Sequence, residues 1–249
     1  MTAAAEDQEE MLAEGTLMSH LAELRNRLFV MFGSVFLVFM ILFPFSKTIF
    51  EFASEPLRRV LPGGQLIATG TASPVIATLK LSFYLALIIA MPVVLYQMWA
   101  FIAPGLYKKE KRFAFPLLAS SIVLFYVGLA FAYFVVFPLI FNFVVAFTPE
   151  SVTYMPDITD YIGFVMMLVL VFGLAFETPV ATVLIVWTGL TTVDKLGKAR
   201  PYVFLGAFVV GMLLTPPDII SQIMLAIPVY LLYELGIIMA KLFKSRPVK

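Results

Sequence analysis

The segment FIAPGLYKKEKR, Phe101–Arg112, decides the fold because it places a dense group of charges between two long apolar runs. Four cations surround a single acid, Glu110: they are Lys108, Lys109, Lys111 and Arg112. Such a group of charges cannot lie in hydrocarbon, so we expect a loop that faces water. Short basic loops of membrane proteins stay on the cytoplasmic side. This loop therefore sets the direction in which the other apolar segments cross the membrane.

The composition is that of a protein that crosses the membrane several times. Of the 249 residues, 61% are hydrophobic and 13% are charged, whereas a soluble domain is about 45–50% apolar and about 25% charged. The absence of cysteine and the single histidine exclude disulfides, cysteine nucleophiles and a His-rich metal site. No P-loop, HExxH motif or nucleophile elbow occurs, so the sequence predicts neither an enzyme nor a bound cofactor or metal.

Six apolar segments approach the roughly 20 residues that a spanning helix needs, which predicts an all-α polytopic membrane protein. They cover about 25–45, 74–100, 113–141, 161–187, 201–214 and 219–240. We assign residues 16–241 to one six-helix transmembrane domain and 242–249 to a basic cytoplasmic tail. Residues 1–15 are acidic and lack the basic start of a signal peptide, so we interpret them as a disordered cytoplasmic tail.

The distribution of Lys and Arg places both termini in the cytoplasm. One side of the predicted membrane has thirteen cations and the other has three, with Lys80 at the edge of the second span. The thirteen are Arg25, Arg27, Lys108, Lys109, Lys111, Arg112, Lys195, Lys198, Arg200, Lys241, Lys244, Arg246 and Lys249, and the three are Lys47, Arg58 and Arg59.

The outer side and the prolines predict the shape of the bundle. We expect one or two short helices within residues 46–73, on the outer surface. The fifth span, of about 14 residues, measures roughly 21 Å against a hydrocarbon core of about 30 Å, so we expect the fifth and sixth helices to be short. Prolines inside spans bend helices, which predicts a curved bundle; they are Pro92, Pro116, Pro138, Pro179 and Pro228.

Three acids are candidates for function. Glu177 lies inside the fourth span and is expected to face protein or a water-filled cavity, because charge in hydrocarbon is costly; a protonated or locally paired structural glutamate is the alternative. Glu23 and Glu110 lie on the same membrane face, where each carboxylate could hold a guanidinium in a forked pair. The alternative for Glu110 is a local salt bridge, and for Glu23 a pair with Arg27 at i+4.

Polar residues also flank the last two spans. Thr215 and Gln222 could hydrogen-bond a neighbouring helix or cap their own. For Asp218 and Glu234 we favour plain structural roles, a helix cap and an interface anchor.

Four motifs resemble the TatC family, whose members are the receptor subunit of the twin-arginine protein translocase. They are SHLAELRNRL (19–28), FIAPGLYKKEKR (101–112), FGLAFETPV (172–180) and RPYVFLGAFVVGMLLTPPD (200–218). The resemblance extends from about Thr16 to Lys241, and it is closest to proteobacterial members.

The resemblance implies a function and a set of site residues. It implies binding of the twin-arginine signal peptides of folded precursor proteins at the cytoplasmic face, by Glu23, Arg25, Phe101 and Glu110. It implies docking of the single-span TatA-type and TatB-type subunits at Met212, Thr215, Asp218 and Gln222, a sensitive outer-loop position at Pro56 and an intramembrane polar site at Glu177. It also implies export driven by the proton-motive force through a multi-copy complex in the lipid bilayer of the bacterial inner membrane, without nucleotide, cofactor or nucleic acid.

Two other functions remain open. A proton-coupled small-molecule transporter could use Glu177 as its proton carrier, but such folds favour inverted repeats, and we find no matched half and no second intramembrane acid paired with Glu177. A scaffold for a membrane complex is the other alternative, and a precursor-binding assay separates it from a receptor.

Overall fold

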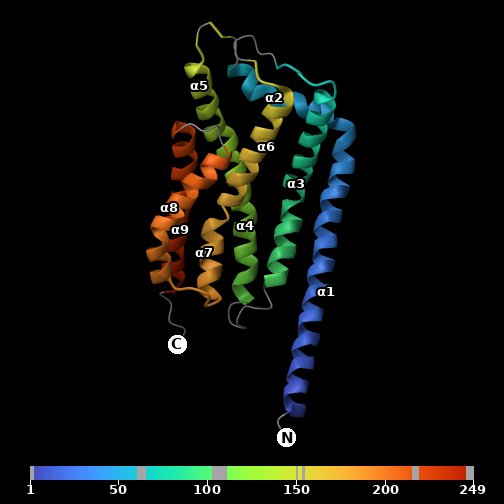
Figure 1. Cartoon of the computed structure of the whole chain (residues 1–249), viewed down its shortest axis with the longest axis vertical. Coiled ribbons are helices and arrows are strands. Elements are labelled where there is room, and N and C mark those ends of the chain that lie inside the picture. The colour runs from blue at the N-terminus through green and yellow to red at the C-terminus, as the bar shows by residue number, and fades with distance from the viewer. Residues whose placement is uncertain are drawn as a thin grey trace.

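The computed structural model shows a bundle of helices (Figure 1). It describes residues 3–60, 66–102, 111–149, 151–152, 155–214 and 219–244. Within these ranges the only extended pairing is an isolated parallel bridge between Ile67 and Asp157. The helices are α1 (Ala3–Leu42), η1 (Phe43–Phe45), α2 (Ser46–Val60), α3 (Ser73–Ile102), α4 (Lys111–Phe131), the π-helical η3 (Ala132–Val136), α5 (Phe137–Phe147), α6 (Ile158–Ala175), α7 (Thr178–Trp187), α8 (Val193–Leu214) and α9 (Ile219–Lys244).

The elements run up and down the bundle in turn, so the start of α1 and the end of α9 lie at the same end (Figure 1). We call this the basic end; here α3 ends at Ile102, α4 begins at Lys111 and α8 begins at Val193. The opposite end carries α2, which matches the short helix expected within residues 46–73.

Five described segments are long and apolar enough to cross a membrane, and they agree with five of the predicted spans. The segments are Leu21–Glu55, Ser73–Phe101, Phe115–Phe147, Ile158–Trp187 and Gln222–Leu242. The remaining predicted span, 201–214, lies within α8.

The last two helices are longer than the sequence analysis expected. Helix α8 has 22 residues because it begins at Val193, where a polar turn with Asp194 and Lys195 precedes the apolar part. Helix α9 has 26 residues. The α8–α9 pair nevertheless ends below the level that α2 and α5 reach (Figure 1).

Helix α1 begins at Ala3, so it includes most of the stretch that the sequence analysis assigned to an N-terminal cytoplasmic tail. The stretch is rich in Ala, Glu, Gln, Met and Leu, which are good helix formers, so the helix that spans the membrane extends back through it.

Of the five prolines expected to bend spans, Pro138 and Pro179 lie where the regular α-helix is interrupted, whereas α3, α4 and α9 continue through the other three. Pro138 has no N–H to offer the carbonyl of Phe134, and the chain forms the π-helix η3 immediately before it. Pro179 likewise cannot bond to Ala175, which is the last residue of α6. The fourth span is therefore divided into α6 and α7, and Glu177 lies at the break.

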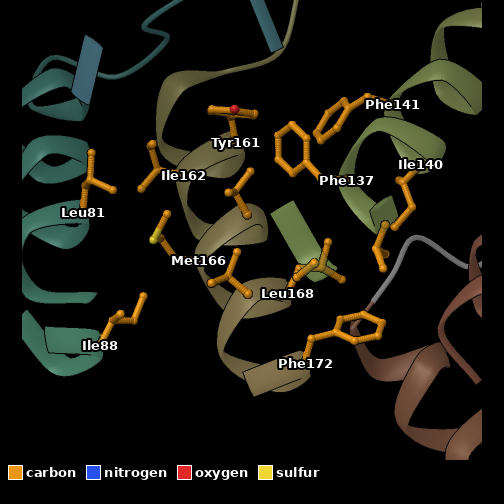
Figure 2. Packing of buried hydrophobic residues seen from close by; sticks show 14 of the residues in the cluster. Leu81, Ile88, Phe137, Ile140, Phe141, Tyr161, Ile162, Met166, Leu168 and Phe172 are labelled. Carbon is orange, nitrogen blue, oxygen red and sulfur yellow. The ribbon is translucent and has the colours of Figure 1, made fainter. Parts of the chain in front are cut away.

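Helix α6 occupies the centre of the main core, between α3 on one side and α5 on the other (Figure 2). The buried side chains of this core include Leu81, Ile88, Phe137, Ile140, Phe141, Tyr161, Ile162, Leu168 and Phe172. The Tyr161 hydroxyl donates to the carbonyl of Ala53 at 3.2 Å and so ties α6 to α2. By contrast, α1 packs mainly against α3, through Val35, Ala86 and Ala90.

Candidate functional site

A cavity of about 530 Å³ lies at the basic end between α1 and α3, lined by Ala22, Glu23, Asn26, Arg27, Val30 and Gln97. The Arg27 guanidinium donates to Oε1 of Glu23 through both Nε, at 3.1 Å, and Nη2, at 2.5 Å. Its Nη1 donates to Oε1 of Gln97 at 3.2 Å. Arg27 therefore joins the candidate carboxylate on α1 to a polar side chain on α3.

The structure brings together some of the four residues assigned to signal-peptide binding and separates others. Glu23 lines the cavity with 39% of its side chain exposed. Phe101 lies one helical turn beyond Gln97 on α3 and is partly exposed, so the two side chains share a helix face. Arg25 is exposed and does not line the cavity. It follows Glu23 by two positions, and residues two apart on a helix do not face each other. Glu110 lies outside the described residues.

Sequence reasoning missed Gln97 as a contributor to this cavity. A signal was present, because Gln97 is a lone amide within the apolar run VVLYQMWAFI. The local Glu23–Arg27 pair was among the alternatives considered, and it is present here.

A second polar site lies inside the bundle at the break between α6 and α7. The hydroxyl of buried Ser121, on α4, donates to Oε2 of Glu177. Oε1 of Glu177 is buried and has no hydrogen-bond partner among the described residues. Glu177 thus faces protein, as expected for an intramembrane acid, and its partner Ser121 could not be identified from sequence spacing.

Two glycines allow neighbouring helices to pack closely around this break. A Cβ atom on Gly128 of α4 would lie 2.6 Å from the carbonyl oxygen of Phe172. A Cβ atom on Gly236 of α9 would lie 2.8 Å from Oγ1 of Thr182 on α7. On the two sides of the break, α6 therefore packs closely against α4 and α7 packs closely against α9.

The two described residues assigned to partner docking, Met212 and Gln222, lie on the α8–α9 hairpin. The Gln222 amide donates to the carbonyl of Phe208 at 2.7 Å, so it bonds a neighbouring helix rather than capping its own. Met212 is 53% exposed. Thr215 and Asp218 lie outside the described residues. Pro56, the outer-loop candidate, lies within α2, and its side chain is outside the described part.

Towards the basic end, an ion pair between Arg200 and Glu234 joins the two helices of the same hairpin. Arg200 of α8 donates to both carboxylate oxygens of Glu234 on α9, at 2.6 and 2.8 Å, and the Tyr230 hydroxyl donates to the same group at 3.0 Å. The bond to Glu234 and its negative charge raise the pKa of Arg200 above its usual value. Glu234 thus joins two helices of this chain, which differs from the interface anchor that the sequence favoured.

At the end of the bundle opposite the basic end, the Asp157 carboxylate accepts hydrogen bonds from Thr69 and from Thr159. Asp157 caps α6 by accepting from the backbone N–H of Thr159 at 2.7 Å. Its other oxygen accepts from the backbone N–H and the hydroxyl of Thr69, at 2.9 and 2.7 Å. The hydrogen bonds from Thr69 and Thr159 hold the pKa of Asp157 well below its usual range.

Comparison with known proteins identifies relatives over nearly the whole chain. Residues 19–228 match the family model described as Sec-independent protein translocase protein (TatC). The chain is 51% identical over 247 residues to the Sec-independent protein translocase protein TatC of Azotobacter chroococcum mcd 1, covering 99% of this chain and 95% of the relative. It is 52% identical over 231 residues to the protein of that name from Escherichia coli K12, covering 92% and 90%.

A solved structure has the same fold. The crystal structure of the twin-arginine translocase receptor TatC superposes with a TM-score of 0.83 at 39% identity, covering 91% of this chain and all of that one. These matches favour protein translocation over small-molecule transport.

Proposed function

Because this chain belongs to the TatC family of Sec-independent protein translocases, we propose that it is the signal-recognition core of a twin-arginine translocase. The family moves proteins across membranes and is not a family of enzymes, and this chain has the apolar helices of a multi-pass membrane protein. The proposed ligand is the signal peptide of a folded precursor, which carries two adjacent arginines. The observation that carries the proposal is the Glu23 carboxylate, which lines an open cavity at the basic end.

The chemistry of this end suits a ligand with paired guanidinium groups. A carboxylate accepts a guanidinium through two parallel N–H bonds, which gives both attraction and geometry. We assign one arginine to Glu23 and the other to Glu110, with Phe101 and Arg25 nearby. The many cations at this end repel basic peptides that lack a matching fork. Recognition then takes place on the cytoplasmic side of the bacterial inner membrane, where both termini of this chain lie.

The proposal also assigns roles in insertion of the signal peptide and in partner docking to the rest of the bundle. The apolar part of the signal peptide inserts along the bundle towards Glu177, whose Oε1 accepts no hydrogen bond from the described residues. Single-span TatA-type and TatB-type subunits dock on the α8–α9 hairpin near Met212, Thr215, Asp218 and Gln222, in a complex with several copies. The proton-motive force drives export, and the outer-side position Pro56 supports the assembly.

The test is binding of a purified twin-arginine precursor to variants of this chain in lipid nanodiscs. Loss of a charge-assisted bond costs about 1.5–3 kcal/mol, so Glu23→Gln and Glu110→Gln are each expected to weaken binding by about tenfold or more. Glu51→Gln, an exposed position on α2 at the opposite end, is the matched control and is expected to bind normally. Wild-type affinity in both Glu23→Gln and Glu110→Gln would refute the proposed site.

A further inference from the structure

We propose that Arg27 is a specificity filter for this site: it occupies the Glu23 carboxylate until a ligand guanidinium displaces it, and Gln97 holds it afterwards. The inference rests on the proposed function, in which Glu23 receives an arginine of the signal peptide. It assigns regulation of that site to two residues, Arg27 and Gln97, to which neither the motif resemblance nor the family match gives a role.

The geometry shows that the Glu23 carboxylate already bonds a guanidinium, that of Arg27. Nε and Nη2 of Arg27 both bond to the same oxygen of Glu23, Oε1, while Nη1 bonds to the Gln97 carbonyl oxygen. No described residue donates a hydrogen bond to Oε2 of Glu23. A carboxylate and an amide oxygen thus bond one guanidinium, and we assign Oε2 of Glu23, which accepts no hydrogen bond from a described residue, to the first N–H of an incoming arginine.

Displacement of Arg27 from Glu23 costs little free energy for two reasons. The side chains of Arg27 and Glu23 are 21% and 39% exposed, and partly exposed ion pairs contribute little net free energy. Arg27 also keeps an acceptor when Glu23 is taken, because Gln97 lies 3.2 Å from Nη1 on a different helix. A ligand can therefore take Glu23 without leaving Arg27 unpaired.

The filter discriminates between arginine and lysine because the ligand must replace a guanidinium, that of Arg27, on the Glu23 carboxylate. An incoming guanidinium offers the same pair of adjacent N–H donors that Arg27 withdraws from Glu23, whereas an ammonium is a point charge without that planar pair. A lysine ligand also meets the positive charge of Arg27 without that compensation. Arg27 is thus expected to lower affinity for both kinds of peptide, and to lower it more for lysine.

The test is the dissociation constant of signal peptides carrying Arg-Arg or Lys-Lys, measured with the full-length protein in nanodiscs. Arg27→Gln is expected to strengthen Lys-Lys binding by about fivefold, the equivalent of one partly exposed ion pair, and to strengthen Arg-Arg binding less, so the preference falls. Arg27→Lys keeps the charge but not the fork and is expected to be intermediate. Lys198→Gln removes an exposed cation elsewhere at the basic end and is the charge-matched control.

Gln97 gives an independent test through a double-mutant cycle. Gln97→Leu removes the acceptor for displaced Arg27, so it is expected to weaken Arg-Arg binding by about two- to fivefold. In the Arg27→Gln background the same change is expected to have no effect. Wild-type size-exclusion profiles and melting temperatures identify variants that remain folded.

The outcomes separate this inference from the proposed function. If Glu23→Gln and Glu110→Gln both bind the Arg-Arg peptide normally, the proposed function fails; if only Glu23→Gln does, Glu23 does not receive an arginine and the filter is wrong. If Glu23→Gln loses binding while Arg27→Gln leaves the preference unchanged or weakens Arg-Arg binding, the site is correct and the filter is wrong. An unchanged preference in Arg27→Lys would mean that charge alone acts, which contradicts displacement. Additive effects of Gln97→Leu and Arg27→Gln would contradict the exchange between Glu23 and Gln97.

Discussion

Ser121 on α4 and Glu177, at the break between α6 and α7, are hydrogen-bonded inside the bundle. The bond supplies the one partner that the Glu177 carboxylate has among the described residues, because its other oxygen is buried without one. A buried polar group that loses its last partner costs about 1–3 kcal/mol. The pair therefore connects the stability of the fourth span to the proposed path of the signal peptide.

Replacing the hydroxyl of Ser121 is the first prediction. Ser121→Ala is expected to destabilise the protein by about 1–3 kcal/mol, because Glu177 is left without a partner. In the Glu177→Leu background, where there is no carboxylate to satisfy, the same change is expected to cost less. Thermal unfolding in detergent measures both. Equal melting temperatures for wild type and Ser121→Ala would show that the bond does not stabilise the fold.

Close packing of α4 against α6 gives the second prediction. Gly128→Ala places a methyl group 2.6 Å from the backbone oxygen of Phe172, so a helix must shift, at an expected cost of about 1–3 kcal/mol. Gly163→Ala on α6 is the control, because a Cβ atom there meets nothing within 4 Å. It is expected to be neutral or slightly stabilising. The same melting temperature in both variants would contradict the close approach.

The pH dependence of stability follows from Asp157. Its pKa is lowered in the folded protein by the bonds from Thr69 and Thr159, so its contribution is fully present above the unfolded pKa of about 3.9. The contribution is lost as the pH falls from that value towards the lower, folded pKa. Melting temperatures of wild type and Asp157→Asn should therefore differ at neutral pH and converge below about pH 4. A difference that stays constant with pH would show that the charge of Asp157 is not involved.

The partner-docking proposal predicts a particular order of effects for Gln222. Gln222→Leu removes the donor to Phe208 and changes the surface of the α8–α9 hairpin. It is expected to reduce co-purification of the TatB-type or TatA-type subunit more than it reduces precursor binding. The control is Ile223→Leu, a conservative change at the exposed neighbouring position. If Gln222→Leu reduces precursor binding more than it reduces co-purification of these subunits, the hairpin is not the docking surface.

The bundle was largely predictable because its organisation depends on composition along the chain. Apolar runs located the spans, and the prolines at 138 and 179 marked where the third and fourth spans are interrupted. The extent of α1 and α8 was not predictable, because their polar ends, before Leu21 and around Asp194, continue a helix beyond the apolar part.

The partners of individual polar side chains were less predictable. Glu177 and Glu23 stood out as acids, but Ser121 and Gln97 come from other helices and only packing brings them near. The forked pair between Arg200 and Glu234 also joins two helices and is separated by 34 positions. Sequence periodicity identifies which residues share a face of one helix, and it does not specify which faces meet.

The most direct measurement is site-specific photo-crosslinking from the segment 101–112 to a precursor whose signal carries Arg-Arg, compared with the same precursor carrying Lys-Lys. A signal receptor on the cytoplasmic face predicts a crosslink to the Arg-Arg form that fades with Lys-Lys. No crosslink to either form, in protein that is correctly inserted in the membrane, would contradict the receptor function and would direct attention to proton uptake by Glu177 variants.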